Sequence, residues 1–587
     1  MFCFCYLLPL RGTGCPMYKL FSSIFFVGIS ASCLMHLAVW GDEPYGSEGF
    51  DVTYDDGANP PTINATGTVS GTVLTPSYIQ AFDDILFEQI TLGANSTLAT
   101  FVDSTDADKV SGMFVAAISQ GYGITFDNHG DLSYSISTAP AGSSPSNLLL
   151  PGIGAVVVGQ KISDVPSVTD TKFKVVLNHY GSVTLISSLD SYNLETDAYQ
   201  PVVSALVADS STYVDNTAPS EALVMTYSGS KINVSGDGSM AMGGISVANS
   251  FNAAADYQAQ SNQPVKVVHG GELVLDAEYG AGISASATGI PFSKDTALDS
   301  IANPVYVTVQ NTGTIAVNTS ENSKTNVGIG ILAVSNGFLP DNAKSGTTVT
   351  GGLVSVALDS AQDPSDSSSI IKVGNANTKL GIGVLAVSSG TGGGLDPYSE
   401  GLASSSNGQG SGGEVTVTSS RAIETQGEMS IGIAALSLGG QNTVTTVGSG
   451  NTGTVSVGNY DSDHAPGGGD AVEVTLNEGG DISTLGTTAH GVVALSASGG
   501  GVVINELAQD YSSSTGTQLG DASGSSSSKK GEGKDGGTVE VVNNATISTG
   551  DSNGTGVASV GIVAQSIGGG GGSAGGKACV AVYRWFG

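Results

Sequence analysis

The chain has 587 residues, of which 85 are glycine, 12% are charged and 6% are aromatic. Its formal net charge is −33, which excludes nucleic acid and anionic membrane surfaces as favoured partners. The many Gly, Ser, Thr, Asn and Asp residues between Val, Ile and Ala favour short strands joined by tight turns. The five cysteines lie near the two ends, which excludes a disulfide framework and a Cys-based zinc site between them: Cys3, Cys5, Cys15, Cys33 and Cys579.

The N-terminal segment is predicted to be an export signal. Residues 20–40 are apolar or small almost throughout and follow a lysine, and small residues lie near the end of the stretch. We therefore predict a signal peptide over residues 1–41 with cleavage before Asp42, and Met17 is an alternative start. Two other interpretations stay open. An uncleaved stretch of this length can span a bilayer, and Cys33 can accept a lipid.

A strand–turn–strand unit recurs along the chain. It consists of two alternating apolar positions, a polar turn that usually contains glycine, and a second alternating pair. The copies cover residues 124–132, 307–315, 474–482 and 539–547, with looser copies near Val175, Ile232, Val268 and Val415. The alternation of period two predicts strands with one buried face and one exposed face.

A second unit follows the first and is more apolar. In residues 330–335 it is Gly-Ile-Leu-Ala-Val-Ser. Its small residues suit a strand that another backbone approaches closely. Strong copies begin at Gly330, Gly383, Gly432, Gly491 and Gly561, and weaker ones at Gly112, Gly244 and Gly282.

The spacing of the strong copies drifts from about 49 to about 70 residues. The additional residues accumulate after the second unit and before the next Val-x-Val, as in residues 391–413 and 508–537. Insertions at one point of each repeat behave as loops on one face of a solenoid.

These patterns predict an all-β, right-handed parallel β-helix (a solenoid) with loop insertions on one face. A coil of three short strands and three turns needs about 24 residues, so each repeat is expected to form two rungs. Twenty-odd rungs would then stack over about 100 Å. An array of β-sandwiches or a propeller is the competing architecture. We expect an irregular β-helix over residues 42–225, a repetitive one over residues 226–576, and an atypical tail at 577–587 that indicates truncation.

The glycine-rich tract at residues 561–576 resembles a repeated phrase in bacterial autotransporter passengers, and the related copies extend the resemblance over roughly residues 230–576. The resemblance implies a parallel β-helix that a C-terminal outer-membrane β-barrel carries to the surface of a Gram-negative cell. It concerns the scaffold and indicates no activity. No barrel-like pattern follows in this sequence, so the chain departs from the family there, and the periplasm is an alternative location for a truncated chain.

No residue pattern predicts catalysis, a cofactor or a metal site, and we predict none of the three. The histidines His129, His179 and His269 are expected in equivalent, solvated turns, and the Gly-Gly that follows His269 resembles an oxyanion-loop fragment only in part. Residues 571–575 around Ser573 match the nucleophile-elbow pattern without its strand-to-helix context. The sequence likewise indicates no site at His464, at His490, at His36 in the signal, or in the basic loop of residues 525–530 and Lys534.

The sequence therefore predicts a secreted or surface-displayed passenger that acts as an adhesin or structural rod and is not an enzyme. Host-cell surface molecules, matrix or further copies of the chain are the expected partners. Two alternatives remain: a polysaccharide-acting enzyme built on a β-helix, which needs clustered acidic or basic residues on one strand face, and a nonfunctional truncated remnant.

Overall fold

The computed structural model describes strands between Phe50 and Ile567. The chain divides into a unit of residues 1–41 and a unit of residues 42–587, and the described residues belong to the second unit. The predicted signal and the tail at 577–587 lie outside them. Side chains are described in residues 124–133, 175–187, 204–210, 221–236, 242–248, 265–287, 306–321, 327–336, 350–359, 371–390, 410–439, 468–497, 536–550 and 559–566.

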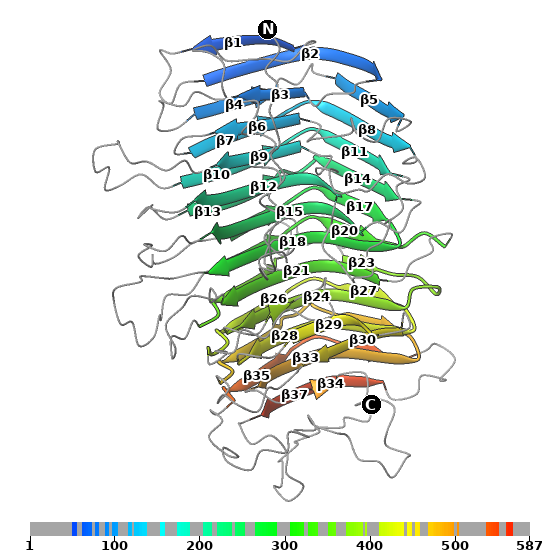
Figure 1. Ribbon diagram of the computed structural model, residues 1–587. Coiled ribbons are helices and arrows are strands. Elements are labelled where there is room, and N and C mark those ends of the chain that lie inside the picture. Colours follow the sequence, from blue (N-terminus) through cyan, green and yellow to red (C-terminus); the bar gives the residue numbers. More distant parts are fainter. Residues whose placement is uncertain are drawn as a thin grey trace, which may run out of the picture. The chain divides into compact units, whose positions relative to one another are not determined.

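Every regular element in the described residues is a β-strand, and almost all of them belong to three parallel ladders (Figure 1). The predicted all-β class and the parallel β-helix are therefore confirmed. No described segment forms a helix that is long and apolar enough to cross a membrane.

The first ladder consists of β2 (Thr62–Thr72), β4 (Glu88–Leu92), β7 (Gly123–Asn128), β10 (Phe173–His179), β13 (Ser220–Thr226), β16 (Val265–His269), β19 (Val307–Asn311), β22 (Val354–Leu358), β26 (Val415–Ser419), β31 (Val472–Leu476) and β35 (Val539–Asn543). Its first strand is covered by β1 (Phe50–Asp55), which pairs with β2 in the antiparallel sense.

The second ladder begins in the latter half of β2 and continues through β5 (Thr97–Asp103), β8 (Asp131–Ser137), β11 (Ser182–Ser187), β14 (Lys231–Gly236), β17 (Glu272–Asp276), β20 (Thr314–Val317), β23 (Ile371–Val373), β27 (Ile423–Gln426), β32 (Ile482–Leu485) and β36 (Ile547–Thr549).

The third ladder is the 11-stranded sheet of β3 (Ser77–Gln80), β6 (Val115–Ser119), β9 (Ile153–Val158), β12 (Val203–Tyr213), β15 (Ala241–Asn252), β18 (Tyr279–Gly289), β21 (Val327–Gly337), β24 (Leu380–Ser389), β28 (Met429–Leu438), β33 (Thr488–Ala497) and β37 (Val560–Ile567). A further sheet joins β25 (Gly394–Leu395), β29 (Thr443–Gly448), β30 (Thr452–Val457) and β34 (Val502–Val503).

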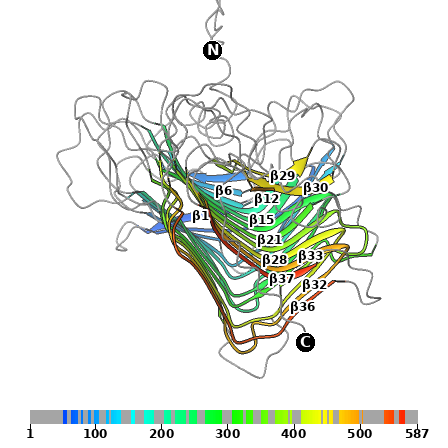
Figure 2. The ribbon, with the colours of Figure 1, turned by 90° about the horizontal axis from the view of Figure 1, so that it is seen from below.

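Each rung takes one strand from each ladder in chain order, and the strands of successive rungs lie over one another when viewed along the stack (Figure 2). The prediction of two rungs per repeat is wrong, because one repeat forms one rung and the third ladder has 11 strands. At about 4.8 Å per rung the stack extends over about 50 Å, half the predicted length. The coil from Val415 to Leu438 has the predicted minimal size, and insertions account for the rest of the period.

The predicted repeat units correspond to the ladders. The strand–turn–strand unit provides the first and second ladders, as in β19 and β20, and the apolar unit provides the third. The predicted copy at residues 474–482 begins two residues too late. The structure pairs Val472, and not Val474, with Val415 and Val539, because the turn after β31 is longer than its counterparts.

The insertions are concentrated where the predicted loops were placed. From β15 onward, the longest connections run from a third-ladder strand to the next first-ladder strand: residues 253–264, 290–306, 338–353, 390–414, 439–471 and 498–538. A smaller number interrupt other turns, such as residues 359–370 between β22 and β23. The connections that vary in length are therefore attached mainly along one edge of the column.

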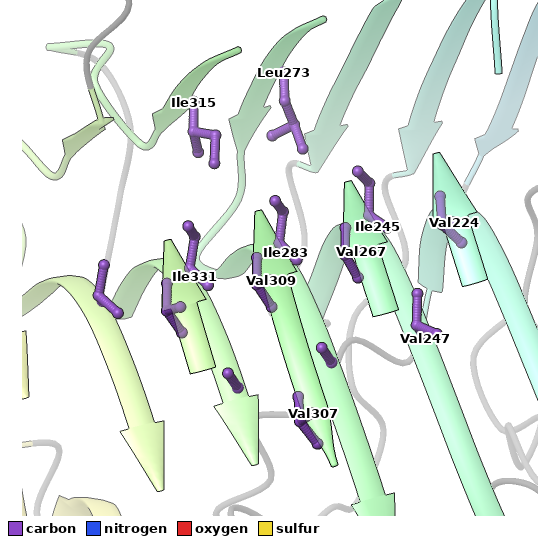
Figure 3. Close-up of a cluster of buried hydrophobic side chains, with 14 of the residues drawn as sticks. Val224, Ile245, Val247, Val267, Leu273, Ile283, Val307, Val309, Ile315 and Ile331 are labelled. Carbon is purple, nitrogen blue, oxygen red and sulfur yellow. The ribbon is translucent and has the colours of Figure 1, made fainter. Parts of the chain in front are cut away.

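The interior of the column is filled by aliphatic side chains from all three ladders (Figure 3). Val307 and Val309 of the first ladder, Ile315 of the second and Ile331 of the third are fully buried. Register pairing places each of them above an aliphatic residue of the neighbouring rung. Burial of this kind contributes about 25 cal/mol per Å² of apolar surface and is the main stabilising term of the stack.

The glycine of the apolar unit allows the rungs to approach closely. A Cβ on Gly383 would lie 2.5 Å from the carbonyl oxygen of Gly432, and a Cβ on Gly432 would lie 2.5 Å from that of Gly491. Pairing is interrupted at each of these glycines and resumes on both sides of it. The third-ladder strands β24 and β28 are buried on both faces, which explains why this unit is the more apolar one.

The serine that ends the apolar unit closes each coil. Ser388 Oγ donates to the carbonyl of Gly352 (2.7 Å) and accepts from the amide of Gly413 (2.9 Å). Ser437 Oγ donates to the carbonyl of Gly413 (2.8 Å) and accepts from the amide of Asp470 (2.7 Å). These partners immediately precede first-ladder strands. The serines therefore connect the end of the third strand to the start of the next rung.

Ser388→Ala is expected to lower the free energy of unfolding by about 1–3 kcal/mol, because it leaves a buried amide and a buried carbonyl without their partner. Urea denaturation followed by circular dichroism measures this loss. Ser235→Ala, at an exposed position of β14, is the control and is expected to change the midpoint little. Equal shifts in the two variants would refute a closing role for Ser388.

Candidate functional site

The residues that end the first-ladder strands form one column, in register from rung to rung: Asn128, His179, Thr226, His269 and Asn311. All five side chains are buried. The prediction that His129, His179 and His269 occupy equivalent solvated turns is therefore wrong. His179 and His269 are the last strand residues and face the interior, whereas His129 comes one position later, in the turn, and is partly exposed.

Both buried imidazoles are hydrogen-bonded at each ring nitrogen. His179 Nδ1 lies 2.9 Å from Asn128 Nδ2, and its Nε2 lies 3.3 Å from the carbonyl oxygen of Lys231. Because an amide NH₂ only donates and a carbonyl only accepts, His179 is neutral with its proton on Nε2.

His269 has the corresponding arrangement. Its Nδ1 lies 2.6 Å from Thr226 Oγ1, and its Nε2 lies 3.3 Å from the carbonyl oxygen of Thr314. Because a carbonyl only accepts, Nε2 donates to Thr314, and Nδ1 of the neutral ring accepts from the Thr226 hydroxyl. The same hydroxyl accepts from the amide of Gly270 (3.2 Å). The column thus contains two hydrogen-bonded pairs, Asn128–His179 and Thr226–His269, inside an apolar core. The buried Nδ2 of Asn311, in contrast, has no hydrogen-bond partner among the described residues.

Burial governs the titration of these groups. Desolvation lowers the pKa of His179 to about 4, against a raising effect of the hydrogen bond to Lys231 and of the Asp131 carboxylate. Desolvation likewise lowers the pKa of His269 to about 4; the hydrogen bond to Thr314 raises it and the neighbouring His179 lowers it. Neutral, enclosed imidazoles of this kind are structural groups without access to a substrate.

The outer side of the same turn carries a stack of aromatic rings. His129 and Tyr180 lie 4.3 Å apart at an interplanar angle of 6°, and Tyr180 and Tyr227 lie 4.1 Å apart at 10°. Tyr180 is 38% exposed. Desolvation in the stack, followed by its hydrogen bond with Tyr227, raises the pKa of Tyr180 above its ordinary value. Between the paired strands β7 and β10, Asn178 Nδ2 donates to Asp127 Oδ1 (2.6 Å).

This aromatic stack is partly accessible, since Tyr180 is exposed and His129 and Tyr227 are half-buried. Rings of this kind contribute apolar contact area at little cost in side-chain entropy, which suits a contact surface. Sequence reasoning missed it, although Tyr180 and Tyr227 follow the last residue of β10 and β13. The signal becomes visible only when the two turns are aligned rung by rung.

His490 lies in the third-ladder strand β33, where it pairs in register with Ile431 of β28 and Val560 of β37. It is buried, and within the described residues neither ring nitrogen has a hydrogen-bond partner. Desolvation lowers its pKa to about 4. The imidazole therefore replaces an aliphatic residue in an apolar layer.

The remaining candidates lie outside the described residues: His36, His464, Ser573, residues 525–530 and Lys534. In the described part of the chain, no three His, Cys, Asp or Glu side chains form a group that could hold a metal ion. The residues that the structure brings together are the aromatic stack outside the turn and the polar column inside it.

The fold defines the class of the protein as a parallel β-helix solenoid. No family model, no curated protein and no solved structure matches the chain.

Proposed function

We propose that the chain is an exported passenger of the autotransporter type that is displayed or secreted as a non-catalytic scaffold and mediates adhesion through its insertions. One observation carries this proposal. In the described part of the chain, eleven rungs stack in register, and from β15 onward the longest connections leave from the same point of successive rungs. A rigid column with variable loops along one edge suits presentation of contact surfaces.

The composition supports the same role. The low charged fraction of 12% and the net charge of −33 suit a soluble or surface-displayed particle and disfavour polyanionic partners. Host surface glycoproteins, matrix or further copies of the chain are the proposed partners. The aromatic stack of His129, Tyr180 and Tyr227 provides a second contact surface, at the turn between the first and second ladders.

Replacing residues 504–535 by a short Gly-Ser linker tests the proposal. The ladder is expected to keep its circular dichroism spectrum, since loop length affects stability only weakly. Adhesion of beads coated with the full chain to epithelial cells or matrix proteins is expected to fall several-fold. Tyr180→Ala/Tyr227→Ala in the same assay measures the contribution of the aromatic stack. Unchanged adhesion in both variants, or depolymerisation of a polysaccharide by the purified chain, would contradict the proposal.

A further inference from the structure

The aromatic stack ends where one rung has no side chain. The residue after each first-ladder strand occupies the same turn position in successive rungs, because its amide donates to the carbonyl of the strand end one rung earlier. In this turn column His129, Tyr180 and Tyr227 carry rings, Gly270 comes next, and Thr312 follows one rung later. The column of rings is therefore interrupted at Gly270.

One face of the Tyr227 ring borders this interruption. The other face stacks on Tyr180 at a centroid distance of 4.1 Å. Among the described residues, no ring covers Tyr227 on the side of Gly270. Gly270 is half-buried, and Ser228 and Thr312 are exposed. Since successive rungs are about 4.8 Å apart, the interruption has the thickness of one further stacked ring.

Hydrogen-bonding groups surround the place that such a ring would take. A Cβ on Gly270 would lie 3.5 Å from Thr312 Oγ1 and 3.6 Å from the amide nitrogen of Ser228. Thr312 Oγ1 donates to the carbonyl of His269 (3.3 Å), and its lone pairs can accept from a ligand. Within the described part of the chain the Ser228 amide donates to no other group. One donor and one acceptor thus border the interruption.

The neighbouring charges favour a neutral ligand. Glu272 lies two residues after Gly270, and Asp359 follows Thr312 in the turn column; both are exposed. Lys231 is also exposed, but it pairs in register with Glu272, which offsets its charge. A sulfated or sialylated sugar needs a group of basic side chains, and the chain as a whole has a net charge of −33.

The turn column continues with polar side chains beyond the interruption. Each carries a hydroxyl, carboxylate or amide group, and all are exposed or half-buried: Thr312, Asp359, Ser420, Asn477 and Asn544. Such groups form hydrogen bonds with sugar hydroxyls. A ligand that extends along the turn column therefore meets about one polar side chain in each rung.

The geometry points to a binding site for a neutral oligosaccharide, in which one pyranose ring stacks on Tyr227 in the place that Gly270 leaves empty. The C–H face of a pyranose with equatorial hydroxyls is apolar and packs on an aromatic face. Its hydroxyls lie at the edge of the ring, where the Ser228 amide and the Thr312 hydroxyl complement them. Further sugar units follow the polar part of the turn column. The inference rests on the proposed adhesive role, since it names the partner class of the second contact surface.

An aromatic side chain of a protein partner, or of a second copy of the chain, is a poorer occupant. Protein interfaces that bury aromatic residues are depleted of charged residues at their centre. Here the exposed Glu272 and Asp359 lie beside the interruption. The Ser228 amide and the Thr312 hydroxyl would also lose water without gaining the several hydroxyl partners that a sugar offers.

Calorimetric titration of the purified full chain with cellohexaose and with hexa-N-acetylchitohexaose tests the site, and a heparin hexasaccharide is the acidic probe. Saturable binding of at least one neutral probe and none of heparin is expected. Tyr227→Ala is expected to weaken binding by about tenfold. Gly270→Tyr fills the interruption with a ring of the chain itself and is expected to abolish binding although Tyr227 is retained. Circular dichroism verifies the fold of each variant.

His129→Ala is the matched control, because it removes a ring from the other end of the same stack. Its affinity is expected to stay within about twofold of the wild type. Failure of both neutral probes to bind, equal affinities of Tyr227→Ala and His129→Ala, or a preference for heparin would overturn the inference. Self-association that Tyr227→Ala abolishes, without binding of either sugar, would overturn it as well.

The titration uses soluble components, so its outcome is separate from that of the adhesion assay. Sugar binding by a chain that does not adhere to cells or matrix would contradict the proposed function and leave the sugar site in place. Adhesion that depends on the insertion at residues 504–535, without binding of either sugar, would contradict the sugar site alone.

Discussion

Replacing Gly432 by alanine is expected to destabilise the solenoid by about 3 kcal/mol or more. The new Cβ would lie 2.5 Å from the carbonyl oxygen of Gly491 and 2.5 Å from Ile482 Cγ2. Neither neighbour can yield easily, because the carbonyl belongs to a strand paired on both sides and Ile482 is packed in the core. Overpacking of this kind typically costs about 1–3 kcal/mol, and contact with backbone places it at the upper end.

Gly561→Ala is the matched control, since it makes the same chemical change in the same column. Among the described residues, a Cβ on Gly561 meets no atom closer than 3.9 Å, so a change of less than about 0.5 kcal/mol is expected. Urea denaturation and hydrogen exchange in β28 and β33 measure the two effects. A Gly432→Ala variant that fails to accumulate as folded protein also agrees with the prediction, provided that Gly561→Ala folds. Similar stability of the two variants would refute the close-approach explanation.

Acidification from pH 6.5 to pH 4 is expected to remove a large part of the stability. The pKa values of His179 and His269 are lowered from 6.5 to about 4 in the folded state. The unfolded chain therefore binds more protons than the folded chain in this window. The stability that depends on the neutral imidazoles is fully present above pH 6.5 and is lost as the pH falls towards 4. On this basis, protonation of each imidazole lowers the free energy of unfolding by about 3 kcal/mol between pH 6.5 and pH 4. Protonation would also remove the Nδ1 acceptor that Asn128 and Thr226 use.

The variant His269→Asn isolates this effect. Asn128 and Asn311 occupy the same column, so asparagine is compatible with the position. The variant is expected to fold at pH 7. Between pH 6.5 and pH 4 its free energy of unfolding is expected to fall by about 3 kcal/mol less than that of the wild type. Urea midpoints measured at several pH values give the comparison. Ser235→Ala, at an exposed position of β14, is expected to keep the full pH dependence; the same slope in the wild type and His269→Asn would disprove the assignment.

The sequence predicted the fold because the pattern that specifies it is local. Alternation such as Val307-Thr-Val309 fixes which face of a strand is buried, and the recurrence of the glycine unit fixes the period. The predicted number of rungs per repeat was wrong because a period of about 50 residues does not show how many of those residues belong to insertions. Only the pairing of β26 to β28 with their neighbours shows that one repeat makes one coil.

The candidate site was harder to predict because its elements come from different rungs. His179 and His129 look alike in sequence, each beside an asparagine and close to a glycine, yet one residue of offset places the first inside and the second outside. The partners of His269 are separated from it by 43 and 45 residues. No local pattern reports such contacts.

The amino-acid sequence by itself determined that this chain forms a stack of short parallel strands, because hydrophobic period, glycine placement and insertion position are properties of neighbouring residues. The tertiary structure alone decided which histidines are buried and which tyrosines stack. Those features depend on the register between rungs, and register is set by the simultaneous fit of side chains about fifty residues apart in the sequence.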